Sequence, residues 1–127
     1  MSRRLPPLPR PDMHELSIAL SILDIVEKAC RNHNGSRVEL VRVRVGRAAG
    51  VMSDSLSFSF DAAKGGTLAE GAALEIEEVP VGGHCRDCAS DFTVEEKFVF
   101  ACPKCGGAEF TVRTGHELEV VDLEVDE

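Results

Sequence analysis

The chain has 127 residues, of which 43% are hydrophobic, and a formal net charge of −8 at pH 7. This length allows one ordinary domain or two small ones. The acidic balance argues against a nucleic-acid partner, because binding a phosphate backbone requires clustered Lys and Arg. No apolar run approaches the roughly 20 residues of a membrane span, and the N-terminus lacks the apolar segment of a secretion signal. We therefore expect a cytoplasmic protein without a membrane or nucleic-acid partner.

Residues 1–12 combine four prolines with three arginines, which predicts a disordered extension. From Met13 the pattern becomes that of a helix, which Asn34-Gly35 ends. Two adjoining apolar stripes define its expected buried side: Leu16, Leu20, Leu23, Val26 and Cys30, then Ile18, Ile22, Ile25 and Ala29. Asp12 and Glu15 have the spacing of a capping box, provided that residue 12 is present in the mature protein.

Three further segments follow before the cysteines. Residues 38–45 alternate valine with arginine, which predicts a half-exposed strand. Residues 53–64 fit both a strand and a helix; Ser53 as an N-cap and two following glycines favour the helix. Residues 73–79 predict a second strand, ended by proline.

Two Cys-x-x-Cys pairs lie 13 residues apart: Cys85 and Cys88, then Cys102 and Cys105. Four thiolates at this spacing are what a tetrahedral zinc site needs. Four cysteines favour a structural site, because catalytic zinc usually keeps three protein ligands and a water. In a reducing cytoplasm, paired Cys-x-x-Cys motifs indicate metal ligands rather than disulfides. Redox-active dithiols and an iron–sulfur centre remain as alternatives.

The unit that carries these cysteines, residues 82–114, is too small to fold on apolar burial alone. We expect a small cluster beneath the ligands, formed by Phe92, Val94, Phe98, Phe100 and Phe110. His84 is interpreted as a surface residue, and Cys30 as a buried core thiol.

Residues 118–125 predict an acidic terminal strand with an irregularity at Val121, which indicates a β-bulge. The predicted order is helix, strand, helix, strand, zinc unit, strand. This last strand is expected to return to the sheet begun before the insertion. The fold class is therefore α+β: a small sheet with two helices over 13–81 and 115–127, and an inserted zinc-ribbon domain over 82–114.

The segment Met13-His14-Glu15 has a second metal-binding potential. If Met13 is the first residue, its amine, the His14 amide nitrogen and the His14 imidazole form consecutive chelate rings. Such planar nitrogen donors suit Ni(II) or Cu(II) rather than tetrahedral Zn(II). Glu15 would add an oxygen or order the site. Considered alone, a His at a helix start is more often a solvated polar residue.

The sequence resembles the HypA/HybF family of hydrogenase nickel-insertion accessory proteins. The resemblance starts with Met-His-Glu-Leu-Ser-Ile at 13–18 and covers residues 13–127. It continues through Val43-Arg44-Val45-Gly46, Leu56-Ser57-Phe58-Ser59-Phe60, Gly71-Ala72-Ala73-Leu74-Glu75-Ile76, both cysteine pairs and Gly115-His116-Glu117-Leu118.

The resemblance implies a cytoplasmic metallochaperone that carries Ni(II) as cargo and Zn(II) as a structural ion. His14 is then the nickel ligand, supported by the amine of Met13 and by Glu15, whereas Cys85, Cys88, Cys102 and Cys105 bind zinc. The implied partners are a GTPase accessory protein, the hydrogenase large subunit and, in some organisms, urease maturation proteins.

The extension before Met13 departs from the family, whose members begin at this methionine. We expect translation to start at Met13; otherwise nickel binds without a terminal amine there. The alternative function is a zinc-ribbon adaptor that binds proteins and no nickel. No Ser/His/Asp or Cys/His arrangement indicates an enzyme. His33 and His116 are interpreted as solvated residues, and for His116 the alternative is an extra nickel donor.

Overall fold

The computed structural model describes the backbone of residues 13–126 and every side chain in that range except that of Met13. The expected disordered extension over 1–12, with the capping role of Asp12, lies outside the described residues.

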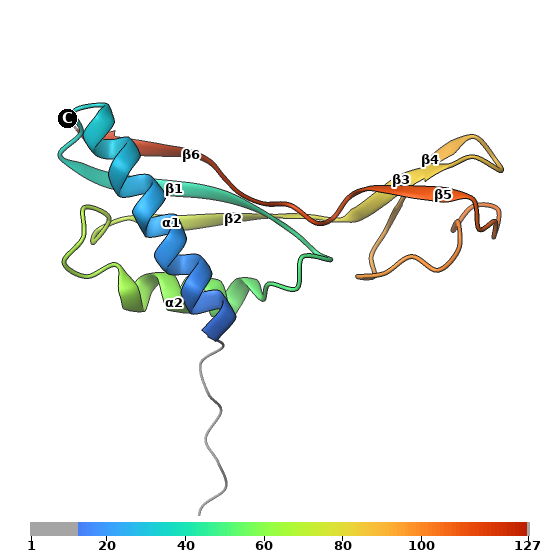
Figure 1. The fold of residues 1–127 in the computed structure, drawn as a ribbon, viewed down its shortest axis with the longest axis horizontal. Coiled ribbons are helices and arrows are strands. Elements are labelled where there is room, and N and C mark those ends of the chain that lie inside the picture. Colours follow the sequence, from blue (N-terminus) through green and yellow to red (C-terminus); the bar gives the residue numbers. More distant parts are fainter. Residues whose placement is uncertain (1–12, 127) are drawn as a thin grey trace, which may run out of the picture.

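The described chain forms two helices and six strands (Figure 1). In order they are α1 (Met13–Asn32), β1 (Arg37–Gly46), α2 (Ser53–Ala63), β2 (Ala73–Val79), β3 (Val81–Cys85), β4 (Ser90–Val94), β5 (Phe110–Thr114) and β6 (Leu118–Asp126). The predicted α+β class and the predicted order of elements are confirmed.

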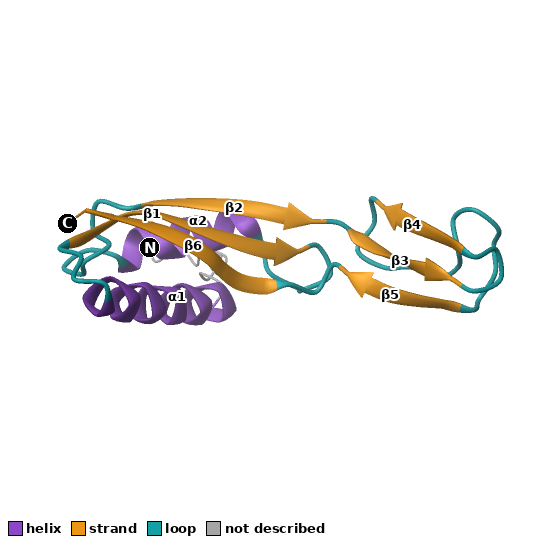
Figure 2. Ribbon diagram, turned by 90° about the horizontal axis from the view of Figure 1, so that it is seen from above, coloured by secondary structure: helices purple, strands orange, loops and turns teal. Residues whose placement is uncertain are grey.

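The main sheet has the strand order β2-β1-β6, with β1 in the centre. β2 runs parallel to β1 and is joined to it through α2, because a parallel pair needs a crossover connection. β6 pairs antiparallel with the other side of β1, as predicted for a strand that returns after the insertion. Figure 2 looks onto this sheet, with α1 alongside β6 and α2 behind the strands.

The second sheet is antiparallel, with the order β4-β3-β5, and continues from one end of the main sheet (Figure 2). Its central strand contains Gly82 and Gly83, where the neighbouring strands approach closely. A Cβ on Gly83 would collide with the carbonyl oxygen of Thr111. These glycines therefore permit close strand packing. The domain boundaries at 82 and 115 stay a prediction.

The main core lies between the valine side of β1 and the two helices. Val41, Val43 and Val45 are almost fully buried, whereas Arg42 and Arg44 lie on the opposite side of the sheet, as the alternation predicted. The helices contribute Ala19, Ile22, Leu23, Val26, Cys30, Leu56 and Phe60. Full burial of a valine, leucine, isoleucine or phenylalanine side chain stabilises a fold by roughly 1.5–3 kcal/mol.

Helix α1 forms where the spacing predicted it, but its buried side is narrower than the two stripes suggested. Leu20 and Ile25 are 52% and 51% exposed. The helix ends before Asn34, which has a φ of 58°. Neither described helix is long and apolar enough to cross a membrane.

Helix α2 confirms the helical interpretation of 53–64, but Ser53 is not its N-cap. The N-cap is Met52, which makes no side-chain capping hydrogen bond. Ser53 is the first helical residue, and its Oγ donates instead to Glu78 at 2.8 Å. The sequence pattern placed the cap one residue late because it contained no information on this partner.

The predicted irregularity at Val121 is a β-bulge. Along β6 the register with β1 passes from Val43↔Val120 to Arg42↔Asp122, which leaves Val121 without an opposite residue. The bulge keeps Val120 and Leu123 on the core side although the strict alternation is broken.

The exposed side of the main sheet carries a ladder of ion pairs. Arg42 and Arg44 on the central strand lie between carboxylates of both edge strands, at N–O distances from 2.8 to 3.4 Å. The carboxylates belong to Glu75, Glu77, Glu119, Asp122 and Glu124. Five acids surround two guanidinium groups, so this side keeps an excess of negative charge.

The turn after β1 joins the two sheets through its backbone. The N–H of Gly46 donates to the carbonyl of Glu117, and that of Ala48 to the carbonyl of Gly115, each at 2.7 Å. A Cβ on Gly46 would collide with the backbone of Gly115. This contact requires glycine at position 46.

The side chain of Arg47 makes a second connection. Its Nη1 donates to the carbonyl and carboxylate oxygens of Glu95, both at 3.3 Å, in the loop after β4. The turn after β1 therefore contacts both the loop after β4 and the segment that connects β5 to β6.

Candidate metal centre

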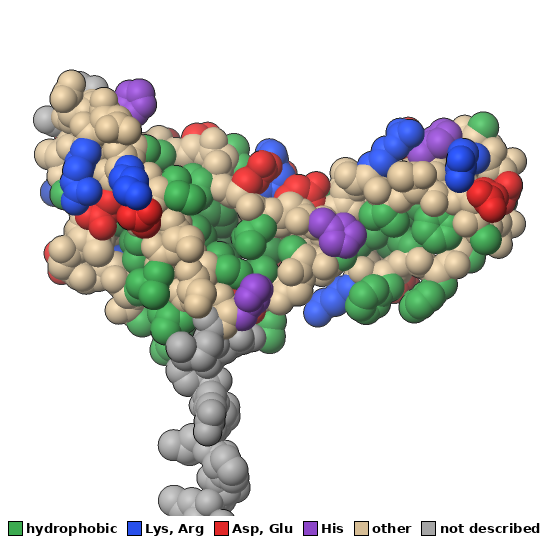
Figure 3. All heavy atoms as spheres, viewed as in Figure 1, with side chains coloured by type: hydrophobic (Ala, Val, Ile, Leu, Met, Phe, Trp, Pro, Cys, Tyr) green, Lys and Arg blue, Asp and Glu red, His purple; other side chains and the backbone are tan. Residues whose placement is uncertain are grey.

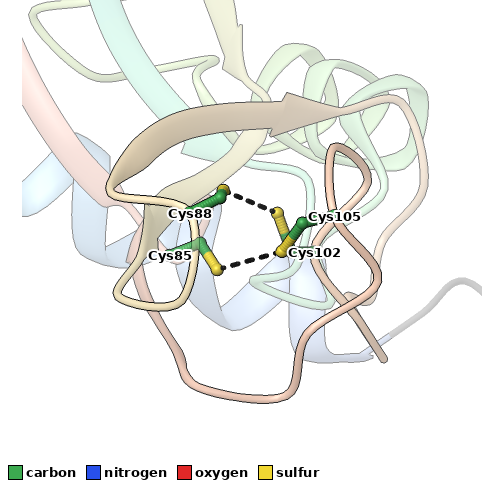
Figure 4. Close-up of side chains that lie close together, drawn as sticks. All are labelled: Cys85, Cys88, Cys102 and Cys105. Carbon is green, nitrogen blue, oxygen red and sulfur yellow. Dashed lines mark hydrogen bonds between the residues drawn. The ribbon is translucent and has the colours of Figure 1, made fainter.

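The four cysteines of the two pairs come together at the far end of the second sheet. Cys85 is the last residue of β3, Cys88 lies in the turn before β4, and Cys102 and Cys105 lie in the loop before β5. All four Sγ atoms lie within 4.8 Å of one another (Figure 4). The structure brings together all four predicted zinc ligands.

The distances between the sulfur atoms fit a tetrahedral metal ion. Cys85 Sγ and Cys105 Sγ lie 3.7 Å apart, and Cys88 Sγ and Cys102 Sγ lie 3.8 Å apart. A tetrahedron with metal–sulfur bonds of about 2.3 Å has edges of about 3.8 Å. None of these cysteines is in a disulfide. Tetrahedral sulfur ligands suit zinc, and they also suit iron.

Backbone N–H groups point at the sulfur atoms of the second pair. The N–H of Lys104 donates to Cys102 Sγ and that of Gly107 to Cys105 Sγ, each at 3.4 Å. Such donors stabilise a thiolate more than a thiol. The tight turn of the second pair therefore prepares both sulfur atoms to act as anionic ligands.

The pKa values show why four thiolates here need a cation. Burial opposes ionisation of Cys102, but the backbone N–H groups of Cys105 and Lys104, together with the side chains of Cys105 and Cys85, outweigh it and lower its pKa to about 7. At Cys105 the N–H of Gly107 favours the thiolate. Burial and the three neighbouring sulfur atoms outweigh this donor and raise the pKa to about 12. One thiol ionises easily, the last one does not, and a bound metal ion must displace its proton.

The residue after each cysteine pair adopts a left-handed backbone conformation. Gly106 has a φ of 74°, and Ala89, at the equivalent place after the first pair, has a φ of 53°. This conformation costs a residue with a Cβ roughly 1–2 kcal/mol. The sequence signal was present: a glycine follows the second pair, and its absence after the first marks a strained position.

Replacing Ala89 by glycine is expected to stabilise the metal-loaded protein by up to about 1 kcal/mol, because relief of this strain exceeds glycine's entropic cost. Gly106→Ala introduces the same strain and is expected to destabilise by a similar amount. Urea unfolding of the metal-loaded protein measures both. A loss of stability in Ala89→Gly would contradict the strain.

The apolar cluster beneath the sulfur atoms is smaller than predicted. Phe92 is buried and packs edge-to-face against Phe110, with ring centroids 5.8 Å apart. Phe98 and Phe100 were assigned to this cluster, but they are 68% and 88% exposed. Val99 between them packs against the cluster instead. The prediction rested on aromatic residue type, whereas in this loop the valine between the two phenylalanines is the residue that turns inward.

The histidines outside the N-terminal segment lie apart from the sulfur atoms. His33 and His116 are exposed. His84 is half-buried, and its Nδ1 lies 2.8 Å from Asp91 Oδ1; this hydrogen bond lowers the pKa of the Asp91 carboxyl. Among the described residues, the four cysteines are the single group of three or more His, Cys, Asp or Glu side chains arranged to hold a metal.

The segment expected to bind nickel opens helix α1. Met13 is the first residue of the helix, and His14 is exposed and lines a groove between α1 and β6. The side chain of Glu15 is fully buried, and its Oε1 accepts a hydrogen bond from the N–H of Met52 at 2.8 Å. Within the described residues, Glu15 Oε2 has no hydrogen-bond partner. The imidazole and the carboxylate therefore lie on different sides of the helix.

Residues 13–125 match the family model described as "Hydrogenase/urease nickel incorporation, metallochaperone, hypA". The chain is 44% identical to a hydrogenase maturation factor HypA from Roseiflexus sp. (strain RS-1), over 91% of this chain and 94% of that one. It is 46% identical to a protein of that name from Geotalea daltonii (strain DSM 22248 / JCM 15807 / FRC-32), over 89% and 99%. The fold is similar to the solution structure of the Ni metallochaperone HypA from Helicobacter pylori, with a TM-score of 0.62 at 22% identity over 88% of this chain and 97% of that chain.

Proposed function

The chain belongs to the HypA family of nickel-incorporation metallochaperones, and on this premise we propose that it binds Ni(II) and delivers it to the large subunit of a nickel–iron hydrogenase. The observation that carries the proposal is the family match, which begins at Met13 and includes the Met-His-Glu segment. The protein acts by holding and transferring an ion, and not as an enzyme.

The start of α1 contains nitrogen atoms of the kind that such a site needs. The first four N–H groups of an α-helix have no acceptor within the helix, and the backbone nitrogens of His14 and Glu15 belong to this first turn. Together with the exposed imidazole of His14 and the amine of a chain that begins at Met13, they form the proposed nitrogen ligand set. Nitrogen donors in one plane suit Ni(II).

Glu15 contributes through its backbone in this proposal, because its carboxylate is directed at α2. The hydrogen bond from the N–H of Met52 to Glu15 Oε1 holds the start of α1 against the start of α2. A buried carboxylate with one unpartnered oxygen is costly unless positive charge lies nearby. A cation bound at the start of α1 supplies such a charge. Glu15 thereby positions the ligands and favours the ion.

The cysteine cluster is proposed to hold Zn(II) as a structural ion, held by all four sulfur atoms with no open position for chemistry. The proposed domains are the nickel-binding part over 13–81 and 115–127, and the zinc ribbon over 82–114.

The proposed function also includes protein partners and a cellular compartment. The chain contains no Gly-x-x-x-x-Gly-Lys-Ser/Thr phosphate loop, so any nucleotide energy comes from a partner. We assign that role to a GTPase accessory protein of hydrogenase maturation, in the cytoplasm. The proposal also includes nickel delivery to urease maturation proteins, since the family description names urease.

The test is a calorimetric Ni(II) titration of protein with its cysteine site loaded. A form that begins at Met13 is expected to bind one nickel ion, and His14→Ala to weaken that binding at least tenfold. His33→Ala, which removes an exposed histidine just beyond the same helix, is the matched control and is expected to change nothing. Because protons compete with the metal ion for an imidazole nitrogen, affinity should fall as the solution is acidified.

A form that begins at Met1 separates the amine from the imidazole. If the form that begins at Met1 binds nickel weakly and the form that begins at Met13 binds it tightly, the terminal amine is a ligand. If the two forms bind nickel equally, the imidazole is the dominant ligand. Binding that survives both His14→Ala and acidification to pH of about 5.5 would remove His14 from the site. Absence of nickel binding in every form would leave a zinc-ribbon adaptor as the function.

A further inference from the structure

Strand β6 is an edge of the main sheet. One side of it pairs with β1, and no described strand pairs with the other side. An edge strand presents unpaired backbone N–H and C=O groups, and a partner segment can extend the sheet by pairing with them. The outer edge of β6 is therefore a ready place for an added strand.

A groove runs beside this edge, between α1 and β6, with a volume of about 390 Å³. Apolar side chains from both elements line it: Ile18, Ile22, Ile25, Leu118 and Val120. Ile25 and Leu118 are about half exposed, and hydrophobic side chains lie open along α1 and between it and the strands in Figure 3. Side chains on the helix side of an added strand would enter this α1–β6 groove and cover them.

The charges around β6 indicate what the other side of an added strand carries. On the exposed side of the sheet, five carboxylates of β2 and β6 surround two arginines of β1. β1 itself alternates valine with arginine and pairs with an acidic strand on each side. A strand of the same kind would complete the pattern on the outer edge of β6.

We propose that the outer edge of β6 at Leu118–Val120 binds an extended segment of a partner protein in which apolar residues alternate with Arg or Lys. The segment forms a fourth strand of the main sheet, with its apolar side chains in the α1–β6 groove and its basic side chains beside the carboxylates. A second copy of β6 does not fit, because carboxylates would lie opposite carboxylates. The bulge at Val121 limits regular pairing to short stretches, of which Leu118–Val120 borders the groove.

His14 lines the same groove, so a bound segment lies next to the start of α1. If nickel binds at the start of α1, the partner lies beside it, and this part of the inference rests on the proposed function. The docking itself does not, and nickel-free protein tests it.

The experiment titrates the isotope-labelled full chain, with its cysteine site loaded and without nickel, with a capped peptide of the sequence of residues 41–46, VRVRVG. NMR shift changes are expected at Leu118–Val120 and along the groove side of α1. Ile25→Gln is expected to weaken binding at least fivefold. Leu20→Gln, an equally exposed position on the same helix that does not line the groove, is expected to leave binding within twofold.

A second peptide with the same composition, its valines grouped and its arginines grouped, separates strand pairing from attraction between opposite charges. It is expected to bind at least fivefold more weakly than the alternating peptide. Equal binding of the two peptides, equal effects of Ile25→Gln and Leu20→Gln, or no binding at millimolar peptide would each overturn the proposal.

Discussion

Replacement of Cys102 by serine is expected to abolish stoichiometric metal binding and to unfold the second sheet. Cys102 is nearly buried, and its Sγ lies 3.8 Å from that of Cys88. Structural zinc contributes on the order of 10 kcal/mol to the folding of small domains, and a hydroxyl is a poor replacement for a thiolate. The apolar cluster beneath the site is too small to replace this contribution. Metal analysis of purified protein and NMR of the second sheet measure the loss.

Cys30→Ala is the matched control for this prediction. Cys30 is a fully buried thiol of the main core and lies outside the metal cluster. Its replacement is expected to reduce stability by about 1–2 kcal/mol and to leave the metal content unchanged. Full metal content in Cys102→Ser would contradict the four-sulfur site, and metal loss in Cys30→Ala would contradict the assignment of roles. Metal analysis also distinguishes zinc from iron.

Gly46→Ala is expected to destabilise the protein by about 2–3 kcal/mol, because overpacking at a rigid backbone contact forces the chain to shift. The added Cβ meets the backbone of Gly115, which has no side chain that could move aside. The shift would also break the hydrogen bond from Gly46 to Glu117. Urea unfolding of the metal-loaded protein gives the change in free energy.

Gly65→Ala separates this clash from a general effect of replacing glycine. A Cβ at position 65 meets no atom within 4 Å, so the variant is expected to be as stable as the parent or up to about 1 kcal/mol more stable. Equal stability of both variants would show that the contact between residues 46 and 115 is less tight than the structure indicates.

Much of the fold could be predicted because local patterns determine it. The alternation over 38–45 predicted β1 and its buried valines, and the acidic terminal segment predicted β6, its return to the main sheet and the bulge at Val121. These features depend on period and charge along a few residues. The segment that forms α2 was ambiguous because its apolar residues fit both the period of a strand and that of a helix. Its contacts with the rest of the protein determine which of the two forms.

The features that the sequence did not reveal depend on contacts made in the folded chain. Ser53 looks like an N-cap until Glu78 from β2 is seen to accept its hydroxyl. Glu15 is polar in the sequence, yet it is fully buried because the N–H of Met52 meets it. Phe98 and Phe100 look like core residues, but a neighbouring valine takes the inward position.

The candidate sites divide in the same way. The cysteine spacing was sufficient to predict the metal cluster, because each pair forms its own turn. The groove between α1 and β6 was not predictable, since it depends on segments far apart in the sequence. The roles of Met13, His14 and Glu15 stay a prediction.

Strand β6 follows the inserted second sheet in the sequence, and this sets an order of assembly. During synthesis the central strand β1 lacks one neighbour until residues 47–117 have been made, and the free energy of closing that loop grows with its length. A metal ion in the cysteine cluster shortens the loop in advance, because it holds β3 and β5 side by side before β6 arrives. Metal uptake at the cysteine cluster is therefore expected to hasten pairing of β6 with β1. In the proposed function, a cell short of the metal for the cysteine cluster would be slow to complete the groove that is lined by His14, the proposed nickel ligand.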